Sequence, residues 1–131
     1  MPLLAQCFIY LLAVMDMNYE WDNNAKNILN PQNTIMQELH VISSVMKPKT
    51  GWFATECIKQ CRQMLGGHGF SSFSKLGSLY SDNDVNNTWE GDNTVLIQQA
   101  TKFAVDCAQK AMKGEKITSQ ILGFISNVLI L

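Results

Sequence analysis

The chain has 131 residues, of which ten are basic and eleven are acidic, giving a formal net charge of -1. This length supports one domain with a single core and is too short for the several layers of a large cofactor-dependent enzyme. With these numbers the chain has no excess of basic residues of the kind that binds nucleic acid. We therefore expect a single domain over residues 1–131, no nucleic-acid partner, and only a part of any multi-domain chemistry.

The first predicted element is a nearly all-apolar stretch over residues 3–15. It lacks the basic region that precedes the apolar part of a signal peptide and a small-residue cleavage site after it. It is also too short to span a bilayer. We predict a core helix and no membrane span, followed by a polar turn region over residues 18–32.

Two helices are predicted next, because apolar residues recur at a helical spacing over residues 35–46 and again over residues 52–65. Pro48 is expected to end the first helix, since proline has no amide hydrogen to donate. Gly66 and Gly67 stand where the second helix would be capped.

Residues 66–93 are rich in Gly, Ser, Asn and Asp and have no sustained period. We predict a long ordered loop with at most short helical turns, and loops of that length are usually functional. Another helix is predicted over residues 96–111, with Asp92 or Asn93 as its N-cap and Gly114 as its stop.

The apolar tail over residues 117–131 is expected to add one more helix, which makes the whole chain an all-α, antiparallel helical bundle. The tail ends in Leu129-Ile130-Leu131, which is not a peroxisomal address of the Ser-Lys-Leu type.

No metal site is predicted. The cysteines form no CxxC pair and have no histidine at ligand spacing, so we expect reduced, buried thiols. A calcium loop starting at Asp82 is disfavoured because its sixth position is Asn87, where glycine is needed, and its twelfth is Asn93, where glutamate is expected. The cysteines are Cys7, Cys57, Cys61 and Cys107.

Two segments carry candidate chemistry. Residues 61–70 hold three glycines after a helix, which indicate either a helix stop and turn or contact with a cofactor. In residues 87–95, Glu90 lies beside Trp89 at a loop-to-helix junction, and Gly91 lets another molecule approach the backbone. Glu90 either meets the dipole of the next helix or acts as a general base, and from the residues alone the dipole is the simpler interpretation.

Taken together, these segments resemble the acyl-CoA oxidases, especially the branched-chain type and oxidase-like relatives. The resemblance runs from about residue 40 to residue 103, while residues 114–131 diverge from the family pattern. The wider acyl-CoA dehydrogenase family has a related glycine loop and a Tyr-Glu-Gly-Thr segment, and His68 with Asp92-Asn93 favours the oxidase branch. The matching segments are Gly66-Gly67-His68-Gly69-Phe70, Asp82-Asn83-Asp84 and Trp89-Glu90-Gly91-Asp92-Asn93-Thr94.

The resemblance implies that FAD is held against this helical domain. Gln63, Gly66 and Gly67 map toward the flavin nucleotide bound by a neighbouring subunit, and Asn93 or Thr94 would reach the cofactor from the start of a helix. The family bundles form the dimer interface, so a homodimer or association with other oxidase subunits is expected.

The resemblance also implies a reaction. Glu90 maps onto the base that removes the α-proton of a fatty acyl-CoA. The β-hydrogen would leave as hydride to the flavin. Gly91 would lie against the thioester. The Glu90 backbone N–H and a flavin hydroxyl would polarise the thioester carbonyl. The products would be a 2-trans-enoyl-CoA and hydrogen peroxide, formed in the peroxisome during fatty acid β-oxidation.

Family members also carry an N-terminal helical domain, a middle β-domain and, in oxidases, a second C-terminal helical domain. We therefore expect a partial enzyme that alone neither holds FAD tightly nor turns over substrate. The alternatives are a non-catalytic relative that associates with oxidase subunits, an acyl-CoA dehydrogenase-type fragment, and a plain helical fold without activity.

Overall fold

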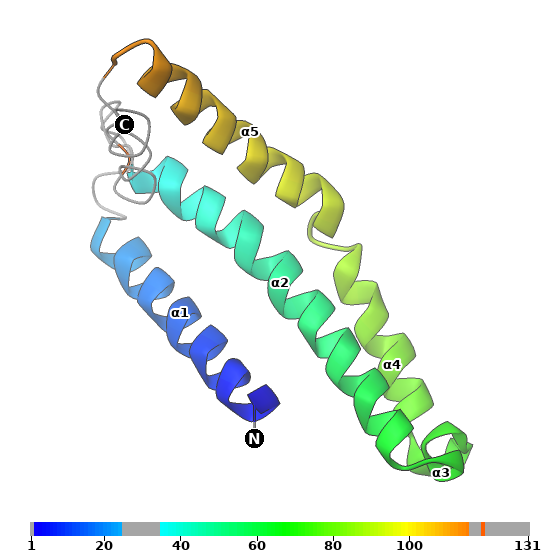
Figure 1. Cartoon of the computed structure of the whole chain (residues 1–131). Coiled ribbons are helices and arrows are strands. Elements are labelled where there is room, and N and C mark those ends of the chain that lie inside the picture. Colours follow the sequence, from blue (N-terminus) through cyan, green and yellow to red (C-terminus); the bar gives the residue numbers. More distant parts are fainter. Residues whose placement is uncertain (1, 25–34, 116–118, 120–131) are drawn as a thin grey trace.

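A computed structural model describes residues 2–24, 35–115 and 119 of the chain (Figure 1). All regular structure within these ranges is helical, which confirms the predicted all-α fold. The predicted helix over residues 117–131 lies outside the described residues, apart from Ser119. The elements in chain order are α1 (Pro2–Asn24), α2 (Ile35–Met64), α3 (Gly67–Phe70), η2 (Ser72–Ser74), α4 (Leu76–Asp84), η3 (Val85–Asn87) and α5 (Asn93–Met112).

The long helix α2 is the centre of the fold and packs against α1, α3, α4 and α5. Figure 1 shows α1 and α5 on opposite sides of α2, and α1, α4 and α5 all running antiparallel to it. An edge-to-face contact between Tyr10 and Phe53, with ring centroids 5.4 Å apart, joins α1 to α2. The predicted antiparallel packing is thus confirmed.

Helix α2 continues through Pro48, so the prediction that a helix ends there is wrong. An interior proline removes one backbone hydrogen bond and costs about 3 kcal/mol relative to alanine. Pro48 is fully buried, and α2 is packed on both sides of it. Residues 41–46 line a groove with α5, while Thr55 accepts a hydrogen bond from Asn83 of α4. These tertiary contacts outweigh the local cost of the proline.

Two regions predicted to be turns or loops are more helical than expected. Residues 66–93 contain α3, α4 and two 3-10 turns, and α1 extends to Asn24, which makes the first part of the predicted turn region 18–32 helical. Asn and Ser are poor helix formers because their side chains compete for the backbone. Here the amide of Asn83 bonds Thr55 across to α2, so tertiary packing decides the local structure.

The predicted helix boundaries at the remaining ends are confirmed. Asp92 is the N-cap of α5, and its Oδ1 accepts hydrogen bonds from the backbone N–H groups of Thr94 at 2.9 Å and Val95 at 3.2 Å. Gly66 after α2 and Gly114 after α5 have positive φ angles of 55° and 75°. Glycine reaches this left-handed conformation without steric cost, so it ends both helices.

Much apolar surface of the described residues is exposed. The first predicted helix forms, but its expected place in the core is wrong in this chain, since Leu4, Phe8, Leu12 and Met15 of α1 are each 58% exposed. An apolar surface of this extent marks an interaction site. No described helix is long and apolar enough to cross a membrane. The buried apolar side chains of the described residues are Leu39, Pro48, Ala100 and Cys107.

The cysteines are free, but the expectation of buried thiols is wrong for Cys7 and Cys61, which are exposed. Cys107 is buried, and this burial raises the pKa of its thiol above the ordinary value. A raised pKa lowers the fraction of reactive thiolate at a given pH, and burial limits access of a reagent.

We expect a thiol-alkylating reagent at neutral pH to modify Cys7 and Cys61 first and Cys107 about tenfold more slowly. Peptide mass spectrometry over time measures the three rates. In urea the rates should converge, and a native Cys107 that reacts as fast as Cys7 would contradict its buried position.

Candidate functional site

The structure separates the predicted site residues into two groups. Gln63, Gly66 and Gly67 lie at the end of α2, while the loop that carries Glu90 precedes α5. Figure 1 shows α3 at the far end of α2, with α4 leading from there back to the start of α5. The nine residues of α4 alone separate the groups by roughly 13 Å of helix. We call residues 63–70 the glycine turn and residues 88–92 the Glu90 loop.

Arg62 holds the glycine turn together. Its Nε donates a hydrogen bond to the backbone oxygen of Gly69 at 3.3 Å, and its guanidinium carbon lies 4.6 Å from the ring centroid of Phe70. The same group lies 5.8 Å from the Tyr80 ring of α4. Cation–π contacts of this kind fix a turn against a neighbouring helix.

The outer part of the glycine turn is accessible. Gln63, Gly66 and Gly67 are exposed, and no atom stands within 4 Å of where a side-chain carbon would be added at either glycine. Gly69 differs, because an added carbon would overlap the backbone carbonyl of Arg62. Gly69 therefore allows the close backbone approach within the turn. Gln63, Gly66 and Gly67 are accessible to a bound molecule.

We expect Gly69→Ala to lower the free energy of unfolding by about 1–3 kcal/mol, because the new methyl group has no room. Gly67→Ala is the matched control and should change it by less than about 0.5 kcal/mol. Urea unfolding of both variants measures the difference. Equal effects would show that the close approach of Gly69 to Arg62 is wrong.

The Glu90 loop has a left-handed backbone at two successive residues, Glu90 with φ 54° and Gly91 with φ 97°. A non-glycine residue in this region is uncommon, and such strain gathers at functional sites when the surroundings hold it in place. Lys47 of α2 fixes the position of this loop. Its Nζ donates hydrogen bonds to the backbone oxygen of Gly91 at 2.6 Å and to Oδ1 of Asn93 at 2.7 Å.

A partly buried amide network, centred on the buried Asn93, lies beneath the loop. Asn93 is 2% exposed, and its Nδ2 donates to Oδ1 of Asn87 at 3.0 Å. Asn87 in turn donates through Nδ2 to Oγ1 of Thr55 at 3.2 Å. A side-chain carbon at Gly51 would stand 2.9 Å from Oδ1 of Asn87, so α2 approaches the network closely at a glycine.

The amide network involves Asn93, one of the two residues predicted to contact the cofactor at the start of α5. Both polar groups of the Asn93 side chain are used inside the chain, toward Lys47 and Asn87. This geometry gives Asn93 the role of positioning the loop, in place of the expected direct contact of its side chain. Thr94 is exposed, and its contact with the cofactor stays a prediction.

Glu90 itself is exposed and lines an open groove of about 310 Å³ with Lys47, Thr50 and Trp89. Within the described part of the chain, neither its carboxylate nor its backbone N–H has a hydrogen-bond or ion-pair partner. Asp92 occupies the N-cap of α5, and the first turn of that helix holds no acidic residue. Glu90 therefore lies outside the first turn of α5, and among the described residues its carboxylate and its N–H have no partner.

Comparison with known proteins gives the family. The family model described as the acyl-CoA oxidase C-alpha1 domain matches residues 1–105. The chain belongs to the acyl-CoA oxidase family. The matched range takes in α1, which precedes the stretch from residue 40 on which the sequence resemblance was based.

Individual acyl-CoA oxidases agree with this assignment. Peroxisomal acyl-coenzyme A oxidase 2 of Oryctolagus cuniculus is 35% identical over 119 residues, which cover 91% of this chain and 18% of the relative. Probable acyl-coenzyme A oxidase acox-1.5 of Caenorhabditis elegans is 34% identical over 116 residues, covering 88% of this chain and 18% of the relative. The chain thus spans about 18% of the length of these relatives.

The fold is that of the acyl-CoA oxidases as well. The crystal structure of acyl-coA oxidase3 from Yarrowia lipolytica superposes with a TM-score of 0.76 at 30% identity, over 90% of this chain and 18% of the other. Acyl-CoA oxidase-1 of Caenorhabditis elegans, complexed with FAD and ATP, gives 0.76 at 22% identity over 86% of this chain and 17% of the other.

Several residues that build the candidate site were not predicted from the sequence. Lys47 and Thr55 lie on α2 and act on groups more than thirty positions away in the chain. Arg62 lies within residues 61–70, but no function was predicted for it. No local pattern indicates such long-range contacts. Among the described residues, no three His, Cys, Asp or Glu side chains gather in a way that would hold a metal.

Proposed function

We propose that the chain supplies the catalytic base of an FAD-dependent oxidation of fatty acyl-CoA to 2-trans-enoyl-CoA, as part of a larger protein or assembly. The observation that carries the proposal is the state of Glu90. Within the described ranges its carboxylate and its N–H are both without partners, and its backbone is held by the bond from Lys47 to Gly91. An acid–base residue needs a free carboxylate held at a fixed place.

In this proposal the Glu90 carboxylate accepts the α-proton of the acyl thioester. The Glu90 N–H donates a hydrogen bond to the thioester carbonyl, where negative charge develops as the proton leaves. Gly91 presents no side chain at this point, so the thioester approaches the backbone. Lys47 and Asn93 keep the loop in place during the reaction.

FAD fits the chain at the glycine turn. The open space at Gly66 and Gly67 and the exposed Gln63 allow a large planar or phosphate-bearing molecule to approach the backbone there, and Thr94 is exposed at the start of α5. When bound, FAD accepts the β-hydrogen as hydride and passes two electrons to oxygen, which yields hydrogen peroxide. Support comes from the related oxidase of Caenorhabditis elegans, which is complexed with FAD.

The same reasoning extends to partners and compartment. The exposed apolar residues of α1 support association with a second copy or with other oxidase subunits. The peroxisomal names of the relatives support a peroxisomal location. The exposed α1 also favours a second candidate function, a non-catalytic relative that binds oxidase subunits.

A chimera tests the proposal. Residues 1–105 replace the matching segment of the Yarrowia lipolytica oxidase, and flavin absorbance and peroxide release are measured with a mixture of acyl-CoAs. We expect bound FAD and peroxide from the chimera, and neither from the chain alone. A chimera that binds FAD but makes no peroxide would contradict the catalytic proposal and favour the non-catalytic one.

A further inference from the structure

Helix α1 carries a cysteine on the face that packs against α2. The half-buried residues Leu3, Tyr10 and Met17 recur every seven positions, which is the spacing of a helix face that contacts another helix. Cys7 lies four residues after Leu3 and three before Tyr10, so it belongs to the same face. The ring of Tyr10 contacts Phe53, which shows that this face of α1 meets α2.

The contact between Tyr10 and Phe53 also sets the register of the two helices. Because α1 and α2 are antiparallel, one turn back along α1 lies level with one turn forward along α2 (Figure 1). One turn back from Tyr10 is Cys7, and one turn forward from Phe53 is Cys57. Cys7 and Cys57 therefore face each other across the helix pair.

The spacing of packed helices suits a disulfide between these two residues. Helix axes in contact lie about 8–10 Å apart and Cα atoms lie about 2.3 Å from each axis, so facing Cα atoms are about 3.5–5.5 Å apart. A disulfide joins Cα atoms about 4.4–6.8 Å apart. Cys57 and Cys61 lie one turn apart on α2, with Cβ atoms about 5–6 Å apart, beyond the roughly 4 Å that the bond needs. The pair between the helices is thus favoured over the pair within α2.

The electrostatics around Cys57 agree with this register. Burial raises the pKa of the Cys57 thiol above its ordinary value, and a thiolate at Cys7 raises it more than a thiolate at Cys61 does. The interaction of two charges weakens with distance, so this order agrees with Cys7 being the nearer of the two. Thr55 precedes Cys57 by about 200° of helix rotation and bonds Asn83 of α4, so Cys57 faces away from α4.

The two thiols differ in their access to a reagent. Cys7 is exposed and Cys57 is half-buried. The raised pKa of Cys57 lowers its thiolate fraction at a given pH, which slows its own reaction with an oxidant. Cys7 is therefore the thiol that reacts first, and Cys57 is the one that reacts with the product.

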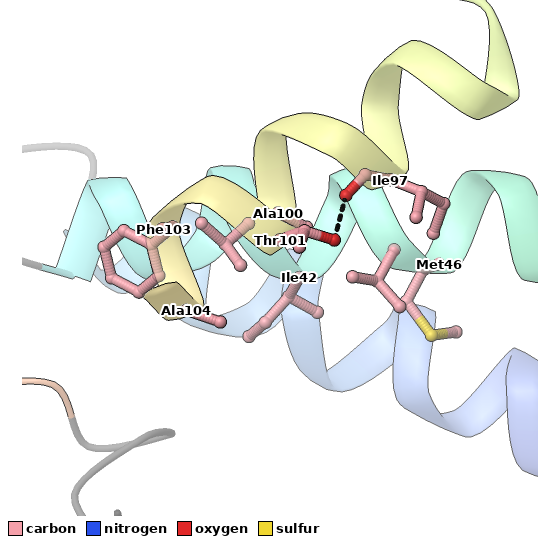
Figure 2. Close-up of a pocket in the computed structure, with 9 residues that line it drawn as sticks. Ile42, Met46, Ile97, Ala100, Thr101, Phe103 and Ala104 are labelled. Carbon is pink, nitrogen blue, oxygen red and sulfur yellow. Dashed lines mark hydrogen bonds between the residues drawn. The ribbon is translucent and has the colours of Figure 1, made fainter. Parts of the chain in front are cut away.

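Cys107 has no such partner among the described cysteines. It is buried on α5, and α1 and α5 lie on opposite sides of α2. Apolar residues and Thr101 line the groove of about 460 Å³ between α5 and α2, and the sulfur in it is the thioether of Met46 (Figure 2). A thioether forms no disulfide, so Cys107 is an internal control for oxidation.

We propose that hydrogen peroxide converts Cys7 and Cys57 into a reversible disulfide that ties α1 to α2. The Cys7 sulfur attacks peroxide, so the O–O bond breaks, an S–O bond forms and one water leaves. The Cys57 sulfur then attacks the Cys7 sulfur, so the S–O bond breaks, the S–S bond forms and a second water leaves. Two electrons pass from the thiols to the peroxide, and both thiol protons end in water. Added peroxide drives the step, so it is independent of the proposed function.

Peptide mass spectrometry of the full chain after peroxide treatment tests the proposal. Trypsin cuts after lysine and arginine, which places the four cysteines on four peptides, residues 1–26, 50–59, 60–62 and 103–110. We expect residues 1–26 to be linked to residues 50–59 about tenfold more than to residues 60–62, and dithiothreitol to separate them. No link, equal links to both peptides, or links that join two chains on a non-reducing gel would overturn the proposal.

Cys57→Ser and Cys61→Ser form a matched pair of variants. Cys57→Ser should raise the yield of the dimedone adduct at Cys7 about tenfold, because the sulfenic acid no longer meets a facing thiol. Cys61→Ser should leave both the adduct and the link as in the native chain. Equal effects of the two substitutions would overturn the proposal, and the peptide links of the native chain test it without any substitution.

The bond should also hold α1 in place. Closing the chain between residues 7 and 57 restricts the opening of α1 away from α2. We expect the amides of α1 near Cys7 to exchange hydrogen about tenfold more slowly after peroxide treatment in the native chain and in Cys61→Ser, and at an unchanged rate in Cys57→Ser. Unchanged exchange in an oxidised native chain would show that the bond does not tie α1 to α2.

Discussion

In the chimera, Glu90→Gln is expected to lower kcat for peroxide formation about 10³-fold, the usual contribution of a positioned general base. Glutamine keeps the size of the side chain and the backbone N–H, but its amide does not accept the α-proton. KM and flavin absorbance should change little, because the proposed substrate contacts of the backbone remain. Steady-state peroxide assays with an acyl-CoA measure both constants.

Glu56→Gln is the matched control. Glu56 is another exposed glutamate, on α2, whose ion pair with Lys59 at 3.5 Å is solvent-exposed. Removing such a surface pair has little effect on a protein. An equal loss of kcat in both variants, or full activity in Glu90→Gln, would remove Glu90 from the role of base.

The largest stability effect is expected for Asn93→Ala in the chain itself. The substitution leaves a hole beside Asn87 and removes an acceptor from the Lys47 ammonium group. Leaving buried polar groups without partners costs about 1–3 kcal/mol each, so we expect a loss of about 2–4 kcal/mol in the free energy of unfolding. Urea unfolding followed by circular dichroism measures this loss.

Thr94→Ala tests whether the effect belongs to the network. Thr94 is the next residue of α5, is exposed, and makes no side-chain hydrogen bond among the described residues. Its replacement should change stability by less than about 0.5 kcal/mol. If the two variants lost the same stability, the buried network would not be what holds the Glu90 loop.

The features that were predicted correctly have local causes. Asp92 caps α5 because a short acceptor reaches the backbone N–H groups two and three residues ahead. Gly66 and Gly114 end their helices because glycine takes a positive φ freely. The helical spacing of apolar residues in α2 and α5 likewise expresses a local period. The family resemblance rested on short motifs of the same kind.

The features that were missed depend on contacts between distant parts of the chain. Pro48 remains in a helix because residues on both sides of it are packed against other helices. The Ser-, Asn- and Asp-containing α4 is helical because Asn83 bonds Thr55 of α2, and Asn87 of η3 bonds the same hydroxyl. Lys47 reaches Gly91 across 44 positions, and no sequence pattern reports such a distance. The exposure of α1 likewise depends on what else packs against it.

The proline in α2 is adjacent to the lysine that holds the Glu90 loop. Proline fixes its own φ near −65° and leaves one carbonyl of the helix without an amide donor, so it sets the direction between the two halves of α2. The first half carries Lys47 and the second carries Thr55, and both are anchors of the same loop and network. The backbone direction at one proline thus determines the spacing of two anchors, and with it the position of the loop that carries Glu90.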